Sequence, residues 1–348
     1  MTQPIYRAGI IGLGFIGGGD QMSGDRLGQQ VTSLDGNHCE ALLRHPRVQL
    51  VAGSSRDGGR RERFERRSGA KTFGDWKQML DSERLDIVSV ASFAPSHAEL
   101  VEACAESGVR AIFCEKPIAT RLESAERMIK SCQQSGSLLV INHNRRFHPQ
   151  YREMARRITA GALGELTGIW LTWPSGRLGN VGTHFIDAAL MLTGSSVVGV
   201  SATLDLAGRP DCRGPEFRDP GGWALLRLAN GVIIHVHAPD YANSPAEIVI
   251  HGTLGRATIS VGVAAIKAWQ GEPEILPRTS PETGTSMDQA VKEIVEWLDT
   301  GKPLCCSAEE SRHTLEVIVA CHVSHARQSA WTPLPLTGAD RDLEVHSG

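Results

Sequence analysis

Three glycines near the start of the chain have the spacing of a phosphate-binding turn. The apolar run Ile5–Ile11 can form a buried parallel strand, and Gly-x-Gly-x-x-Gly follows it directly. In such a turn the first glycine permits a tight bend, the second lets the backbone approach a pyrophosphate, and the third lets a helix pack close to the strand. The same pattern occurs in turns that bind no nucleotide. The candidate cofactor contacts here are Gly12, Gly14, Phe15, Ile16 and Gly17.

The second predicted strand, Val48–Gly53, ends in hydroxyl and guanidinium groups. In an NAD-binding unit an Asp or Glu at this point accepts hydrogen bonds from the ribose 2′-hydroxyl. Hydroxyls and guanidinium groups instead suit a 2′-phosphate, which a carboxylate would repel. The sequence therefore favours NADP over NAD, although the arginines that follow can also form one solvated helix face. The candidate contacts are Ser54, Ser55, Arg56 and Arg60.

A lysine between a carboxylate and a proline follows a later predicted strand, Ala111–Cys114. Its ammonium, if partly desolvated, can donate a hydrogen bond to a substrate oxygen and tune proton transfer there. The ordinary alternative is a surface charge. Ligands bind beyond the carboxyl ends of parallel strands, so we expect this lysine to share one edge with the glycine turn. The residues expected at that edge are Ser92, His97, Glu115 and Lys116.

The elements that must position these residues change character near residue 145. Before it, short apolar runs alternate with helical segments, which predicts a doubly wound parallel sheet: a Rossmann dinucleotide-binding domain over 1–145. After it, strand-like segments crowd between 167 and 263, the last of them expected over 257–263, with a hairpin turn at 229–231. We expect an α+β domain over 146–348, with a large open, mostly antiparallel sheet. The open sheet face needs a cover, so we expect a homodimer or homotetramer through it.

Residues 18–36 form a polar, glycine-punctuated stretch where a helix normally continues. This stretch leaves the glycine turn and therefore lies near the phosphates. It is interpreted either as a tolerated surface loop or as a flap over cofactor or substrate.

The composition describes an ordinary soluble globular chain and excludes several classes. The 348 residues are 41% hydrophobic and 22% charged, with 36 basic and 39 acidic side chains and a net charge of −3. That balance provides no overall field for nucleic acid or an anionic membrane. No apolar run approaches the ~20 residues that a membrane span needs, and no signal-peptide pattern is present. We expect a cytoplasmic protein.

The eight cysteines are scattered, and none has C-x-x-C spacing. We therefore expect buried reduced thiols, with no disulfide framework and no metal site. Cys321-His322-x-x-His325 has residue types that bind metals, but the segment is expected to be an amphipathic helix, so these side chains are interpreted as packing residues.

Five motifs occur in order along nearly the whole chain. They are Gly12-x-Gly14-x-x-Gly17, His38-x-x-Ala41-Leu42-x-x-x-Pro46, Cys114-Glu115-Lys116-Pro117, Gly161-x-x-Gly164-Glu165 and Gly182-x-His184-x-x-Asp187. Together they resemble the glucose–fructose oxidoreductase and inositol dehydrogenase-like (Gfo/Idh/MocA) family. The resemblance implies a nicotinamide-dependent oxidoreductase acting on a secondary alcohol or ketone of a sugar or cyclitol.

In that family a lysine and a histidine flank the reacting oxygen, and here these positions are Lys116 and His184. The cofactor carries the hydride, while the protein supplies position and a proton relay. By the same resemblance, the expected substrate contacts are Arg145, Trp173, Asn180, His184, Asp187 and Tyr241.

One position departs from the family pattern. Many members carry an aspartate where this chain has Asn180, and an amide can orient a hydroxyl but cannot accept its proton. Two alternatives therefore stay open besides the dehydrogenase. One is an NAD-dependent glycosidase that oxidises the sugar transiently, and the other is a non-catalytic sensor of sugar or cofactor.

Overall fold

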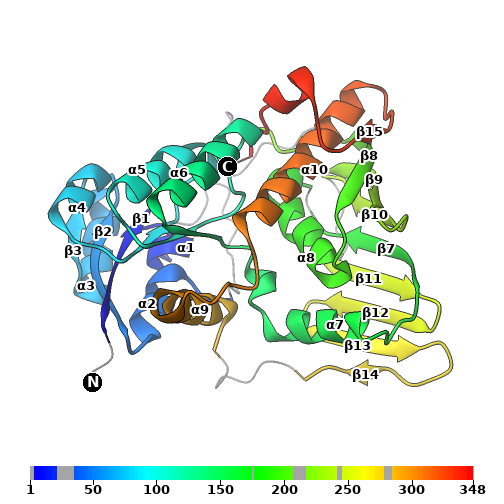
Figure 1. Ribbon diagram of the computed structural model, residues 1–348, viewed down its shortest axis with the longest axis horizontal. Coiled ribbons are helices and arrows are strands. Elements are labelled where there is room, and N and C mark those ends of the chain that lie inside the picture. The colour runs from blue at the N-terminus through cyan, green and yellow to red at the C-terminus, as the bar shows by residue number, and fades with distance from the viewer. Residues whose placement is uncertain are drawn as a thin grey trace. The chain divides into compact units, whose positions relative to one another are not determined.

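The computed structural model describes residues 4–21, 35–174, 176–206, 217–240, 245–277 and 284–347 (Figure 1). The chain divides into two compact units. The first comprises 1–119, 124–147 and 284–309, and the second comprises 120–123, 148–283 and 310–348. Among the described residues no helix is both long and apolar enough to cross a bilayer.

The first unit contains a six-stranded parallel sheet, as the alternation of strands and helices predicts. In spatial order the strands are β3 (Lys71–Phe73), β2 (Val48–Ser54), β1 (Tyr6–Ile11), β4 (Ile87–Val90), β5 (Ala111–Cys114) and β6 (Leu138–Ile141). Every residue of β4 and β5 is buried, because helices cover both faces of the sheet. The order reverses between β1 and β4, where such sheets bind their ligands.

The helices around this sheet begin at polar caps that suit them. The side chains of Asn37, Asp57 and Asp75 accept backbone N–H groups at the starts of α2, α3 and α4. The helices are α1 (Phe15–Gly18), α2 (His38–Arg44), α3 (Gly58–Ser68), α4 (Trp76–Ser82), α5 (His97–Glu106), α6 (Leu122–Ser135) and α9 (Ser286–Thr300).

Helix α9 lies late in the sequence but belongs to the first unit. Its apolar residues from Met287 to Leu298 share one core with Leu42 of α2 and with Tyr6 of β1. The Tyr6 hydroxyl donates a 2.6 Å hydrogen bond to Asp299, just beyond that apolar stretch. The expected domains, 1–145 and 146–348, assign α9 to the second domain, whereas in the structure it packs in the first unit. An amphipathic pattern shows that a helix covers something but not which sheet it covers.

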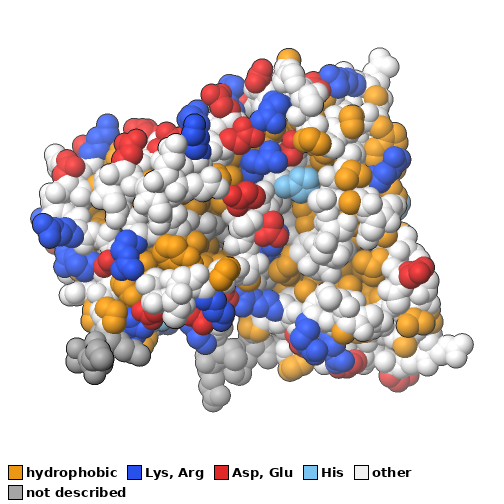
Figure 2. All heavy atoms as spheres, viewed as in Figure 1, with side chains coloured by type: hydrophobic (Ala, Val, Ile, Leu, Met, Phe, Trp, Pro, Cys, Tyr) orange, Lys and Arg blue, Asp and Glu red, His pale blue; other side chains and the backbone are white. Residues whose placement is uncertain are grey.

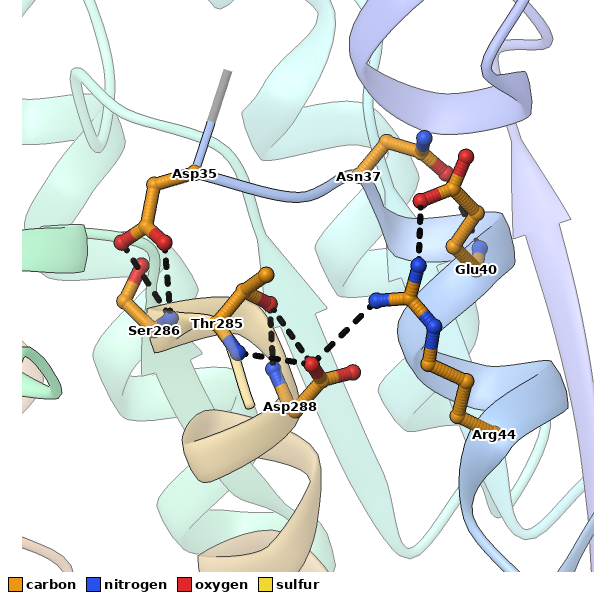
Figure 3. Close-up of polar contacts among 7 residues, drawn as sticks. All are labelled: Asp35, Asn37, Glu40, Arg44, Thr285, Ser286 and Asp288. Carbon is orange, nitrogen blue, oxygen red and sulfur yellow. Dashed lines mark hydrogen bonds and ion pairs between the residues drawn. The ribbon is translucent and has the colours of Figure 1, made fainter. Parts of the chain in front are cut away.

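The start of α9 is tied to the segment before α2 (Figure 3). Thr285 and Asp288 form a capping box, in which each side chain accepts the other's backbone N–H. The Asp35 carboxylate accepts the Ser286 N–H at 3.2 Å, and Arg44 of α2 reaches Asp288 at 3.3 Å. The end of the 18–36 stretch is therefore anchored on α9. Residues 22–34 of that stretch lie outside the described residues, so the choice between a surface loop and a flap is not tested.

The second unit contains the expected large, mostly antiparallel sheet, with nine strands and one parallel pair, β7 with β10. In spatial order these are β14 (Glu274–Ile275), β13 (Val263–Ala268), β12 (Gly255–Ser260), β11 (Glu247–Gly252), β7 (Leu166–Thr172), β10 (Ile233–Ala238), β9 (Gly222–Leu228), β8 (Val197–Leu204) and β15 (Thr332–Pro333). The strand expected over 257–263 is two strands. Gly262, at φ +74°, permits the turn between them.

Among the described residues, helices cover one face of this sheet and leave the other open. The helices α7 (Pro149–Thr159), α8 (Thr183–Thr193) and α10 (Ala308–Ala326) pack on the covered face (Figure 1). Along β9 the residues alternate strictly between buried and exposed. The open face carries Trp170, Trp223 and Leu225, each more than a third exposed. Trp170 stacks on His235 of the neighbouring strand with ring centroids 5.0 Å apart.

Basic and acidic side chains are interspersed over the face seen in Figure 2, without a large patch of one sign. This distribution agrees with the small net charge of −3.

Candidate functional site

The glycine turn between β1 and α1 leaves no room for side chains. Gly12 has φ +99°, and a Cβ there would lie 2.4 Å from the carbonyl oxygen of Ala91. A Cβ on Gly17 would lie 2.0 Å from the carbonyl oxygen of Gly12. Gly14, the N-cap of α1, has no side chain, so only backbone groups line the turn there. This is the construction that a pyrophosphate requires.

The end of β2 lies beside that turn, because the Gly12 N–H donates to the Ser54 carbonyl at 2.9 Å. Ser54 is buried, whereas Arg56 is exposed and its side chain makes no hydrogen bond or ion pair with a described residue. The Asp57 carboxylate caps α3 by accepting the Arg60 N–H, which holds the pKa of Asp57 below its usual value.

Three arginines of α3 are already engaged. Arg63 forms a two-pronged ion pair with the buried Asp20, at 2.7 and 2.9 Å. Arg61 donates to the carbonyls of Ser55 and Arg56, and Arg67 to that of Gly18. Arg63 and Arg67 thus hold α3 against the segment that leaves the glycine turn.

Glu115, at the end of β5, has a buried carboxylate with protein partners on both oxygens. His38 Nε2 lies 3.0 Å from Oε1, and the Asn142 amide donates to the same oxygen at 2.6 Å. The Lys116 N–H donates to Oε2 at 3.2 Å, and His38 Nδ1 lies 3.0 Å from the Ser89 hydroxyl. Glu115 therefore supports the backbone beneath Lys116, whose own side chain is half-buried.

This network keeps Glu115 ionised. Burial alone would raise its pKa, but the hydrogen bond and charge of His38, together with the charge of Lys116 and the amide of Asn142, outweigh that effect. The pKa of Glu115 is lowered to about 2.

His97 connects the two loops at this edge. Its ring is fully buried, with Nδ1 3.0 Å from the Pro117 carbonyl and Nε2 3.1 Å from the Ser92 carbonyl. Burial lowers its pKa against the opposing effect of these two carbonyls. The Ser92 hydroxyl is 2.8 Å from that of Ser96. His97 thus ties the loop after β4, which abuts Gly12, to the loop that carries Lys116.

In the second unit, His184 is the second residue of α8, and Asn180 lies in the π-helical turn η3 (Leu178–Gly182) just before it. Both are half-buried, whereas Asp187 is fully buried in α8. Trp173 is also fully buried, packs on Phe185 at 5.1 Å between ring centroids and donates to the Gly176 carbonyl at 2.6 Å. Trp173, expected as a substrate contact, thus lies beneath the residues that precede η3.

Arg145 lies in the short helix η2 (Asn144–Arg146) of the first unit and is half-buried. Tyr241 falls outside the described residues. Among the described residues no group of three or more His, Cys, Asp or Glu side chains could hold a metal ion.

Sequence reasoning assigned no role to His38 or Asn142. His38 belongs to one of the five sequence motifs. Asn142 directly follows β6, just as the candidate residues Ser92 and Glu115 follow the ends of β4 and β5. Either signal could have placed them with Glu115.

Comparison with known proteins gives two family matches and several relatives. Residues 6–143 match the model of an oxidoreductase family with an NAD-binding Rossmann fold, and residues 170–258 match the GFO/IDH/MocA C-terminal domain. An inositol 2-dehydrogenase from Saccharopolyspora erythraea is 29% identical over 66% of this chain and 65% of its own length. A D-apiose dehydrogenase from Paraburkholderia graminis is 35% identical over 38% of this chain and 35% of its own length. The chain thus spans less than two thirds of these curated relatives.

The fold also matches solved structures. A levoglucosan dehydrogenase complexed with NADH and levoglucosan has a TM-score of 0.78, with 96% of this chain and 100% of that chain covered. Its sequence identity is 20%, so this likeness concerns the fold.

Proposed function

Because the chain belongs to the GFO/IDH/MocA oxidoreductase family, we propose that it is an NAD(P)-dependent dehydrogenase or reductase. The substrate is a secondary alcohol or ketone of a sugar, cyclitol or sugar derivative, in keeping with the names of its relatives. The observation that carries the proposal lies within the first unit. Through His97, the loop bearing Lys116 is joined to the loop that abuts the glycine turn.

When bound, the nicotinamide accepts or supplies the hydride. The residues of the chain then have to hold the substrate oxygen and move its proton. Lys116, on a backbone fixed by Glu115, donates a hydrogen bond to that oxygen, and His184 takes or returns its proton. Asn180 orients a neighbouring hydroxyl as a hydrogen-bond partner. Lys116 belongs to the first unit and His184 to the second, and their joint action is part of the proposal.

The test is turnover of a sugar and cyclitol panel by the wild type, Lys116→Ala and His184→Ala. We expect each substitution to lower kcat by about 10²–10⁴-fold, the usual contribution of a positioned proton-transfer group. Cofactor affinity should change by less than about threefold, because neither side chain is needed to hold the pyrophosphate. Lys130→Ala, at an exposed position of α6, is the matched control.

Three outcomes contradict this function. Retained turnover in both Lys116→Ala and His184→Ala shows that these two residues do not have the roles proposed for them. Release of free sugar without a net change in nicotinamide absorbance indicates a glycosidase. Cofactor binding without turnover of any panel member indicates a sensor.

We also propose that NADP is preferred over NAD, with Arg56 as the main 2′-phosphate contact. Its exposed guanidinium has no hydrogen-bonding or ion-pair partner among the described residues, whereas Arg63 and Arg67 are engaged. Arg56→Ala should weaken NADP binding by at least tenfold, the loss of one charge-assisted contact, and leave NAD binding nearly unchanged. Isothermal titration with both cofactors measures this. Equal or tighter NAD binding by the wild type overturns the preference, and Arg66→Ala is the control.

A further inference from the structure

We propose that Asp219 is a positioning residue for the η3 turn, which carries Asn180 and leads into His184. The inference rests on the function proposed above and deepens it, because it names what holds one side of the site in place. All the contacts that support it lie within the second unit.

Both oxygens of Asp219 are used on this turn. Oδ1 accepts the Gly179 N–H at 2.6 Å, and Oδ2 accepts the Asn180 N–H at 2.7 Å. Asp219 is 7% exposed, so water competes little for these bonds. The next residue adds a third bond, because the Leu178 N–H donates to the Pro220 carbonyl at 3.1 Å. Three successive N–H groups of η3 are thus held by one neighbouring segment.

Residues 345–347 support the same turn. The Arg218 N–H donates to the His346 carbonyl at 3.0 Å, which joins this segment to the one that holds Asp219. Ser347 is fully buried against Gly179, where a Cβ would lie 2.7 Å from that of Ser347 and 3.1 Å from Asp219 Oδ1. Below the turn, a Cβ on Gly182 would lie 2.9 Å from the Trp173 ring. The turn is therefore packed closely on several sides.

The turn transmits its position directly to the helix. The N–H groups of Val181 and Gly182 both donate to the Arg177 carbonyl, and α8 begins at the next residue, Thr183. A shift of Gly179 and Asn180 consequently moves the first turn of α8, which contains His184. Displacement of a reacting group by about 1 Å can cost about 10²-fold in rate.

The chemistry of Asp219 is specific to a carboxylate. Two acceptor oxygens and a negative charge face two N–H groups at the start of a helical segment, an arrangement that the helix dipole favours. Asp219→Asn keeps the shape, but one backbone N–H then faces the side-chain NH₂ group, which can only donate. Gly179→Ala keeps the charge and crowds the turn away from Asp219 and Ser347.

The experiment compares Asp219→Asn and Gly179→Ala with the matched control Asp205→Asn. Asp205 also accepts a backbone N–H, from Asp240 at 3.2 Å, but not one in η3. We expect both test variants to lose about 10- to 100-fold in kcat. Their NADP affinity should stay within about twofold of wild type, because the glycine turn lies in the other unit. The control should change neither quantity.

A second readout does not need turnover. In histidine-labelled protein, the His184 imidazole resonances, assigned by their loss in His184→Gln, should shift in Asp219→Asn and in Gly179→Ala but not in Asp205→Asn. If wild type turns over no substrate, the proposed function fails, whereas these shifts still support the positioning. If both test variants keep the wild-type kcat and their His184 resonances do not shift from those of wild type, the positioning role of Asp219 is overturned.

Discussion

Glu115 shows at the scale of a residue how a buried charge can fix the backbone of a site. Its carboxylate is surrounded by His38, Asn142 and the backbone of Lys116, and its pKa of about 2 means that it stays charged at neutral pH. Burying such a charge is favourable only when every oxygen has a partner. The cluster therefore fixes the backbone from which Lys116 projects.

Glu115→Gln tests this at the level of stability. The amide loses charge-assisted hydrogen bonds, so we expect the free energy of unfolding at pH 7 to fall by about 2 kcal/mol. The folded pKa lies below the ordinary value of 4.5, so the carboxylate stabilises the fold above pH 4.5 and loses that effect as the pH falls toward 2. The difference between wild type and variant should therefore narrow below pH 4.5.

Urea unfolding at pH 7, 5 and 3.5 measures the difference. Glu62→Gln, at an exposed position of α3, is the control and should change little. A difference that widens toward low pH would contradict the buried ionised carboxylate.

The residues near Lys116 were predictable to different degrees. Lys116 and the glycines could be selected from the sequence because their neighbours in the chain determine their positions: a strand end, a proline, a fixed spacing. The partners of Glu115 were not, since His38 is 77 positions and Asn142 27 positions away along the chain. Asp219, 39 positions from Asn180, was missed for the same reason.

At the scale of an element, the β1–α1 unit depends on the close approach of a helix to a strand. Gly17→Ala would place a methyl group 2.0 Å from the Gly12 carbonyl oxygen and 2.8 Å from the Ala91 side chain. We expect a loss of at least about 2 kcal/mol in stability, the scale of an overpacked site, together with a loss of cofactor binding. Thermal unfolding and cofactor titration measure the two effects.

Gly74→Ala serves as the comparison, because the nearest atom to a Cβ there, on Arg61, is 3.7 Å away and Gly74 has no positive φ. Wild-type stability and cofactor binding in Gly17→Ala would contradict the close packing of the turn.

The elements themselves were largely predictable. Alternating apolar runs and helices predicted the parallel sheet, and the density of strand-like segments between 167 and 263 predicted the antiparallel one. What the pattern did not reveal was the hairpin at Gly262, because the segment 257–263, expected as one strand, contains the end of β12 and the start of β13. The spacing of apolar residues indicates a strand but does not show where the backbone turns back on itself.

At the scale of the whole molecule, we propose that the open face of the nine-stranded sheet binds a second copy of the chain. From strand spacing and rise per residue, one face of such a sheet covers roughly 800 Å², which matches one partner's share of a standard interface. Aromatic residues are enriched at such interfaces, and this face carries Trp170 and Trp223 around Leu225.

Leu225→Glu should separate the copies, because it places a charge among the exposed Trp and Leu side chains of that face. We expect sedimentation velocity to give a dimer or tetramer for wild type and a smaller species for the variant, with an unchanged circular dichroism spectrum. Val261→Glu, at a turn position that is 83% exposed, should leave the mass unchanged. A monomeric wild type at micromolar concentration would contradict the proposal.

The late return of α9 has a consequence for how the protein is made. Strands β1 to β6 leave the ribosome long before residues 284–309, yet those residues complete the hydrophobic core around Tyr6 and Leu42. During synthesis that part of the nucleotide-binding unit stays exposed to water until nearly the whole chain has emerged. A gene cut after codon 147 would encode an intact sheet with an uncovered apolar flank, a product prone to aggregate.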